Sequence, residues 1–289
     1  MPYIAMEERF ALKGGTAINL FVRDMPRLSI DIDLAWLPLE PREKTLEKMS
    51  SALRNIADVI RTKIPGVTVG ESYLLDTDSI IRLTVSSLDA VIKIEPNLVI
   101  RGTLFPCEKR RLCGAAQEMF EMTTTAITAS MPDLYAGKLC AALDRQHPRD
   151  IFDIKVLLEN EGITDKIRTA FVVYLASHDR PMSELLDPGM ADFRYLFDRQ
   201  FAGMTMINVD YDELVEIREK MVHTLNTAMT KDEKDFLLSV KQGVPRWDLM
   251  PITDLDKLPA IQWKLMNIRK MNRTRHALAV NKLRRVLER

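Results

Sequence analysis

Hydrophobic and polar residues follow two different periods in the first part of the chain. In the segment 29–36, apolar residues alternate with Asp31 and Asp33, which predicts a strand with both acids on one face. Apolar residues at helical spacing predict a long helix over 43–62. The other elements predicted in this part are a short helix over 16–24 and strands over 67–75, 79–86 and 90–97.

After about residue 130 the pattern is helical throughout. Pro148 separates two helices, predicted over 132–145 and 149–160, and no strand-like run follows them. The later helices are predicted at 164–177, 210–228, 231–241 and 261–288. We therefore expect an α+β protein: a mixed sheet with flanking helices over 1–128, then an α-helical domain over 129–289.

Composition excludes several classes of protein. The 289 residues include 41 Lys and Arg and 41 Asp and Glu, so the formal net charge of zero argues against a protein that coats polyanions. The longest apolar run, 171–176, is too short to cross a bilayer, and the N-terminal segment lacks the apolar stretch of a secretory signal. Three cysteines without a CxxC pair fit a reducing compartment. We expect a cytoplasmic protein without a membrane partner.

Positive charge collects at the C-terminal end. Residues 264–289 contain nine Lys and Arg against a single Glu, a formal net charge of +8, so the other 263 residues carry −8. Such asymmetry is what an anionic partner would use, and a solvated helix face is the plain alternative.

A glycine pair opens the predicted helix at 16–24. Gly14 and Gly15 have no side chains and lead into free helix N–H groups, with the Thr16 hydroxyl beside them, which is a geometry that can receive a phosphate. The segment is not a P-loop, because Lys13 precedes the glycines and no GK[ST] follows. Taken alone, the pair is better explained as a plain turn.

Acids on two strands change that balance. Asp31 and Asp33 point the same way on one strand, and burying both without a cation is costly, so a divalent metal such as Mg²⁺ is indicated. Glu95 shares a face of its strand with Lys93 and becomes a third ligand of a two-metal site if this strand pairs beside 29–36. Lys93 would then tune the site or contact phosphate. The alternatives are an exposed face of salt-bridged acids and a surface Lys93–Glu95 ion pair.

A fourth cluster lies at the start of the helical part. Lys138 and Arg145 are two helical turns apart, and Asp150 and Asp153 are an i, i+3 pair on the next helix. The cations could neutralise phosphate charge, with the acids orienting them or a substrate hydroxyl. An ion-paired helical hairpin is the alternative.

Together, GGT, DID, KIE and K…R…RDxxD resemble the AbiEii-like nucleotidyltransferases, toxins of AbiE-type toxin–antitoxin systems that include the mycobacterial MenT toxins. They belong to the DNA polymerase β-like nucleotidyltransferase superfamily. The superfamily signature is matched by Gly15, Thr16, Asp31, Asp33 and Glu95, the lysine of the family's third motif by Lys138, and its RDxxD motif by Arg149, Asp150 and Asp153.

The resemblance implies an N-terminal nucleotidyltransferase fold whose cleft receives Lys138, Arg145 and Asp150 from the helical domain. It implies two Mg²⁺ ions, with Mn²⁺ as a substitute, and an NTP substrate. Asp31, Asp33 and Glu95 would hold the metal. The residues that would bind the nucleotide are Gly14, Gly15, Thr16, Arg27, Ser29, Lys93 and Arg145, and those that would support catalysis with the metal ligands are Lys138, Asp150 and Asp153. The acceptor would be RNA, in the first place tRNA, and a cognate antitoxin would oppose the resulting block on growth.

Three hypotheses follow from the sequence. The first is a nucleotidyltransferase toxin that transfers NMP to RNA, which the basic residues at 264–289 favour. The second keeps this chemistry with a small molecule or a protein as acceptor. The third is a catalytically silent nucleotidyltransferase fold that serves as a binding module.

Overall fold

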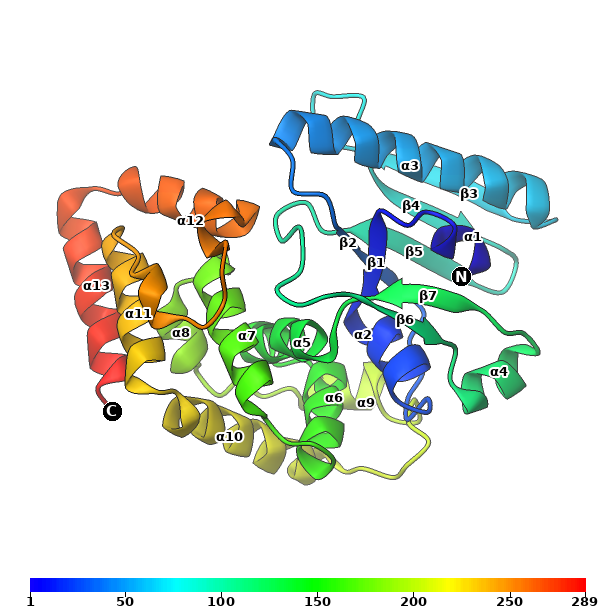
Figure 1. Ribbon diagram of the computed structural model, residues 1–289. Coiled ribbons are helices and arrows are strands. Elements are labelled where there is room, and N and C mark those ends of the chain that lie inside the picture. The colour runs from blue at the N-terminus through cyan, green and yellow to red at the C-terminus, as the bar shows by residue number, and fades with distance from the viewer. The chain divides into compact units, whose positions relative to one another are not determined.

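The computed structural model describes residues 1–289 and divides the chain into two compact units, Met1–Ser130 and Met131–Arg289 (Figure 1). All seven strands lie in the first unit and the second is helical, which confirms the predicted α+β class with its mixed sheet and C-terminal helices. No helix combines the length and the apolar character that a bilayer span requires.

The first unit is built on one mixed sheet in the order β3-β4-β5-β2-β1-β7-β6. Strands β2 and β5 are parallel, as are β1 and β7, and the other neighbouring pairs are antiparallel. The strands are β1 Phe10–Lys13, β2 Ile32–Trp36, β3 Thr68–Tyr73, β4 Ile80–Ser86, β5 Val91–Pro96, β6 Glu108–Arg111 and β7 Thr125–Thr128. This order brings β5 beside β2, although a long helix and two strands separate them in sequence.

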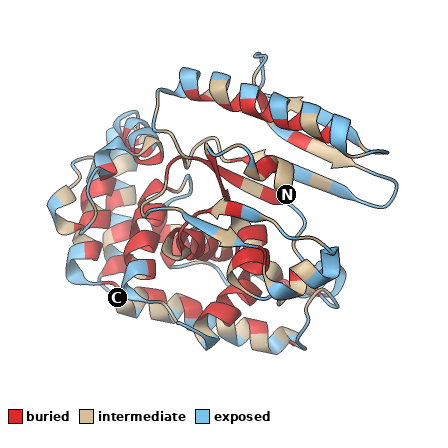
Figure 2. Cartoon of the chain, turned by 45° about the vertical axis from the view of Figure 1, so that its right-hand side comes forward, coloured by how far each residue is buried: buried red, intermediate tan, exposed pale blue.

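Helix α3, Arg42–Lys63, covers one face of the sheet and contacts β3 and β4 (Figure 1). Its buried residues include Met49, Leu53 and Ile56, and buried and exposed positions alternate along it as in an amphipathic helix (Figure 2). The remaining helices of the first unit are α1 Pro2–Ala5, α2 Gly14–Ala17, a π-helix over Ile18–Val22 and α4 Gly114–Phe120. On β5, Val91, Lys93 and Glu95 lie on one face and are exposed or half-buried.

Most of the predicted elements of this unit are confirmed, with two corrections. The strand predicted from residue 29 begins at Ile32, and Ile30, which the alternation would bury, is 57% exposed. The helix predicted over 16–24 begins two residues earlier and widens into the π-helix. The sequence also missed β1, which is buried on both faces as a central strand and shows no alternation.

The second unit packs its helices around α5 and α7, which are buried along most of their length (Figure 2). Side-chain caps fix several helix starts: Thr230 and Glu233 form a reciprocal capping box at the start of α11. The helices are α5 Met131–Arg145, α6 Pro148–Glu159, α7 Asp165–Ser177, α8 Met182–Leu186, α9 Arg194–Gln200, α10 Tyr211–Ala228, α11 Lys231–Gln242, α12 Pro259–Arg269 and α13 Arg273–Leu287, with 3₁₀ turns at Trp247–Leu249 and Leu255–Lys257.

The helical stretch predicted over 261–288 is two helices. Asn272 caps α13 by accepting hydrogen bonds from the backbone N–H groups of Thr274 and Arg275, so the chain turns between α12 and α13. Lys264 of α12 is buried, and its ammonium group donates to the carbonyl oxygens of His178 and Arg180 just beyond α7. One of the nine C-terminal cations therefore has a structural task.

Burial, and secondarily the charge of Lys241, lowers the pKa of Lys264 to about 8. As the pH falls, Lys264 takes up its proton at a higher pH in the unfolded chain than in the folded protein. The free energy of unfolding should therefore rise by about 1–3 kcal/mol between pH 8 and 10.5 through this group. We expect chemical denaturation at several pH values in this range to show the rise in the free energy of unfolding of the wild-type protein. The slope of this free energy against pH should be smaller in Lys264→Met. Equal slopes would contradict the assignment.

Candidate active site

Asp33 and Glu95 lie side by side on two parallel strands. The register of β2 and β5 pairs Asp33 with Glu95, flanked by the pairs Ile32–Ile94 and Leu34–Pro96. Register partners in neighbouring strands point to the same side of a sheet, and here the apolar neighbours point to the other. The condition on which the expected role of Glu95 depended, that its strand lies beside the Asp33 strand, is therefore met.

The glycine turn between β1 and α2 lies against Asp33. Gly14 has φ +69°, a conformation that side-chain-bearing residues rarely adopt, and a Cβ built on it would stand 2.0 Å from Oδ2 of Asp33. The carboxylate thus fills the space that any larger residue would need. This close approach explains why the position is a glycine.

Arg27 and Ser29 stand on the Gly15 side of the same turn. A Cβ on Gly15 would lie 2.8 Å from both Nη2 of Arg27 and Oγ of Ser29. Arg27 is only 3% exposed, and its Nη1 donates to the carbonyl oxygen of Leu28 at 2.9 Å. A guanidinium group and a hydroxyl are therefore gathered at the glycine turn, as predicted for residues that would bind phosphate.

Thr16 connects the glycine turn to the segment that precedes β2. Its hydroxyl donates to the carbonyl oxygen of Asp31 at 2.5 Å and lies 3.1 Å from the Ser29 hydroxyl. The side chain is 2% exposed. Thr16 therefore holds the Ser29–Asp31 backbone against the turn, while its contact with a triphosphate stays a prediction.

The third acid is not gathered with the other two. Asp31 precedes β2 and is exposed, and the structure contains no group of three or more His, Cys, Asp or Glu side chains arranged as a metal site. Glu95 is instead ion-paired with Arg82 of β4, a residue that the sequence reasoning missed. Lys93, exposed on the same face, is not the partner that the sequence suggested for Glu95.

The donor set nevertheless suits a hard divalent cation. Asp33 and Glu95 are adjacent across β2 and β5, and Asp31 precedes Asp33 by two residues. Carboxylate oxygen is the ligand that Mg²⁺ and Mn²⁺ prefer. Arg82 supplies the positive charge that Glu95 needs beside Asp33. An ion bound at Glu95 would take over this charge compensation from the Arg82 guanidinium.

The acid–base cluster of the helical unit is a buried ion-paired hairpin between α5 and α6. Nζ of Lys138 lies 2.9 Å from Oδ1 of Asp150 and 2.9 Å from Oδ2 of Asp153, and all three side chains are at most 6% exposed. Arg145 donates to both oxygens of Asp150, at 2.5 and 3.0 Å, while its own side chain is 63% exposed. His147 caps α6 by accepting a hydrogen bond from the backbone N–H of Arg149.

Electrostatics keeps this cluster charged. Burial alone would raise the pKa of Asp150, but the charges of Lys138 and Arg145 outweigh it and hold that pKa well below its usual range. The Asp150 carboxylate thus remains ionised and holds both cations in place. Within the cluster, Arg145 offers the accessible positive charge.

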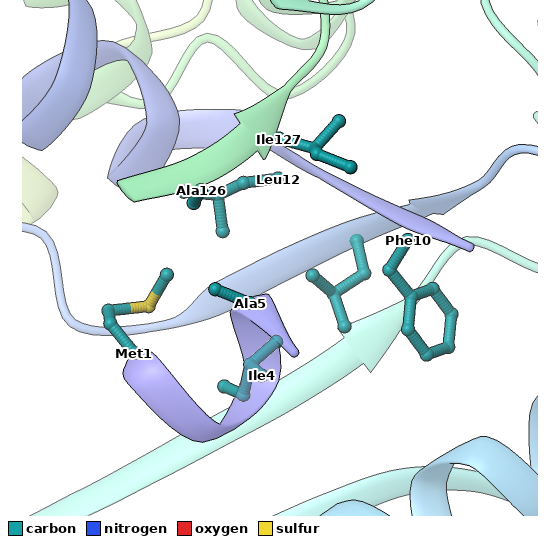
Figure 3. A pocket seen from close by; sticks show the side chains of 8 residues that line it. Met1, Ile4, Ala5, Phe10, Leu12, Ala126 and Ile127 are labelled. Carbon is teal, nitrogen blue, oxygen red and sulfur yellow. The ribbon is translucent and has the colours of Figure 1, made fainter. Parts of the chain in front are cut away.

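A small apolar pocket lies beneath α1, lined by Met1, Ile4, Ala5, Phe10, Leu12, Leu34, Ala126 and Ile127 (Figure 3). These side chains carry no group that donates protons, binds metal or attacks a substrate. The pocket is a packing gap next to β1 and β7, and none of the predicted site residues lines it.

Comparison with known families decides the identity. The family model described as nucleotidyl transferase AbiEii toxin, type IV toxin–antitoxin system, matches residues 2–267. The chain belongs to this family. The AbiEii assignment agrees with the motif resemblance and makes the protein a nucleotidyltransferase, a toxin with an NTP substrate and an antitoxin partner.

Among solved structures, MenT4, a nucleotidyltransferase toxin from Mycobacterium tuberculosis H37Rv, is similar in fold to this AbiEii protein. The TM-score is 0.61 at 15% sequence identity, and the match covers 90% of this chain and 85% of MenT4. A search of curated proteins gave no match.

Gly14→Ala tests whether the glycine turn is needed for activity as well as for stability. The new methyl group would displace the Asp33 carboxylate, so we expect nucleotide transfer to fall by about tenfold or more, with about 1–2 kcal/mol lost from the free energy of unfolding. Gly66→Ala is the matched control, because Gly66 has φ +77° and no atom within 4 Å of its Cβ position. It should lose similar stability and keep full activity. Equal activity losses in both variants would contradict the role of Gly14.

Lys138→Met should leave Asp153 buried without its ion pair. We expect a loss of about 3–5 kcal/mol at pH 7, measured by urea denaturation. Lys138 also holds down the pKa of the buried Asp150, and that pKa would rise without it, so the deficit relative to wild type should shrink as the pH is lowered from 7 toward 4. Lys166→Met, at an exposed position of α7, should stay within about 0.5 kcal/mol of wild type at both pH values. A pH-independent deficit in Lys138→Met would refute this account.

Proposed function

We propose that this AbiEii toxin transfers a nucleoside monophosphate from an NTP to an RNA acceptor, tRNA in the first place, in a Mg²⁺-dependent reaction that takes place in the cytoplasm and blocks growth. The observation that carries the proposal is the register pairing of Asp33 with Glu95 beside Gly14. Two adjacent carboxylates at a side-chain-free turn are what a metal–triphosphate site requires.

Asp31, Asp33 and Glu95 are the proposed metal ligands. Bound Mg²⁺ would neutralise charge on the triphosphate and help to deprotonate the acceptor hydroxyl. As a metal ligand, Glu95 would give up its contact with Arg82, and the Arg82 guanidinium would then be available to the substrate.

The phosphates are proposed to bind at the glycine turn. Gly14 and Gly15 allow close approach of the backbone, Arg27 supplies a buried positive charge, and Ser29 supplies a hydroxyl. Thr16 holds this arrangement in position through Asp31 and Ser29. Lys93, exposed on the Glu95 face of β5, adds a cation that can reach phosphate.

In the helical unit, Lys138 and Arg145 are the proposed phosphate-neutralising cations, oriented by Asp150 and Asp153. The ion pairs support this division of tasks, because Arg145 is anchored at both oxygens of Asp150 and still has most of its side chain exposed. Lys138 is buried and forms ion pairs with both acids of α6, Asp150 and Asp153. Asp150 in turn binds Arg145.

The acceptor is tested by incubating the protein with each labelled NTP, Mg²⁺, and tRNA, small-molecule or protein acceptors in parallel. Label on tRNA, and a mass increase of one nucleotide in intact cellular RNA after induction, is the expected result. Label confined to a small molecule or to protein would overturn the RNA acceptor and leave the chemistry in place. No label on any acceptor would indicate a silent fold.

Asp33→Asn should abolish transfer without unfolding the protein. Removing one of two adjacent carboxylates relieves repulsion, so the free energy of unfolding should stay within about 1 kcal/mol of wild type, while transfer falls by about a hundredfold or more. Asp89→Asn, the same change in the exposed turn before β5, serves as control and should retain full activity. Near wild-type transfer by Asp33→Asn would show that this acid does not act in catalysis.

A further inference from the structure

Helix α13 lies outside the part of the chain that the AbiEii family model matches. The match ends at residue 267, and α13 spans Arg273–Leu287. The helix contacts α11 and α8, beside which it runs (Figure 1), and its buried residues are Val280, Leu283, Val286 and Leu287. The apolar face of α13 is thus buried within the helical unit.

The opposite face of α13 is a basic stripe. Arg275, Leu278, Lys282, Arg285 and Arg289 recur at steps of three and four residues, so they share one side of the helix and its C-terminal end, and all are exposed. We call these five residues the α13 stripe. Leu278, 64% exposed, is the single apolar residue in it.

Most of this charge is available to a partner. Arg275 and Arg285 form no ion pair, and neither do Arg269, Lys270 and Arg273 around the turn before α13. Lys282 and Arg289 make only exposed ion pairs, with Glu184 at 3.4 Å and Asp187 at 2.8 Å. Exposed pairs of this kind contribute little stability and exchange readily for another anion.

We propose that the α13 stripe docks the phosphate backbone of the RNA acceptor. The inference rests on the proposed function for its RNA substrate and adds where that RNA is held. A row of cations on one helix face, two of them without an ion pair and two in exposed pairs only, complements a polyanion. A membrane surface fits less well, because helices that bind bilayers present a broad apolar face and that face of α13 is buried.

The test uses the full chain and equilibrium binding of total tRNA between 50 and 200 mM salt. The stripe variant carries Arg275→Glu, Lys282→Glu and Arg285→Glu. The matched control carries Lys166→Glu, Lys220→Glu and Lys231→Glu, three exposed lysines of the same unit that form no ion pair, so the change in net charge is the same. Circular dichroism and thermal unfolding establish that both variants are folded.

We expect the stripe variant to bind tRNA on the order of tenfold more weakly at low salt, with a flatter salt dependence, while the control stays within about twofold of wild type. Equal weakening of both variants, or an unchanged salt slope in the stripe variant, would overturn the inference. The inference would also be overturned if the stripe variant lost binding to vesicles of anionic phospholipid and bound tRNA as well as the wild type does.

A second readout separates this inference from the proposed function. Transfer from NTP to a dinucleotide acceptor should be retained by the stripe variant, because such an acceptor depends little on a docking surface. If the wild-type protein modifies no RNA, the proposed function fails, and the tRNA binding measurement still decides the docking surface. If the wild type modifies tRNA and the stripe variant does so with the same KM, the docking surface is refuted.

Discussion

Two carboxylates on neighbouring strands repel each other, and the first unit of this protein holds Asp33 and Glu95 together in that way. Adjacent strands are about 4.8 Å apart, so neither side chain can avoid the other without leaving the face of the sheet. Arg82 balances the charge at Glu95, and Gly14 leaves Asp33 the room that any side chain would occupy. The strand order and the glycine turn together allow these two carboxylates to lie next to each other, where we propose that a metal–nucleotide complex binds.

The helical unit also holds two acids close together, and there fixed cations compensate their charge. Asp150 and Asp153 are almost fully buried; Lys138 is ion-paired with both, and Arg145 is ion-paired with Asp150. Removing one partner from such a cluster costs far more than an exposed ion pair contributes. The exposed cations of α13 are of the second, weakly paired kind, which makes them suited to reversible contact with an anion. The same unit therefore holds buried cations in fixed ion pairs and carries exposed cations that we propose contact RNA.

Much of this arrangement could be predicted from residue patterns. The alternation around Asp33 and the position of Glu95 on a later strand indicated a shared site on the condition that the two strands lie side by side, and the β2–β5 register meets that condition. Arg82 was missed because its contact with Glu95 depends on which strand lies on the far side of β5, and a single sequence does not specify that order. The buried role of the Thr16 hydroxyl was missed for the same reason, since it requires the Ser29–Asp31 segment to fold back over the turn. The break between α12 and α13 was missed because the apolar periodicity continues through it, although Asn272 is a helix-capping residue type.

The most direct test of the account is a crystal structure of the protein with Mn²⁺ and a non-hydrolysable NTP analogue, with the metal located by its anomalous scattering. We predict an anomalous peak within coordination distance of both Asp33 and Glu95, with the triphosphate at Gly14 and Gly15 and the Arg82–Glu95 ion pair broken. A metal and nucleotide bound elsewhere, with Glu95 still paired to Arg82, would contradict it.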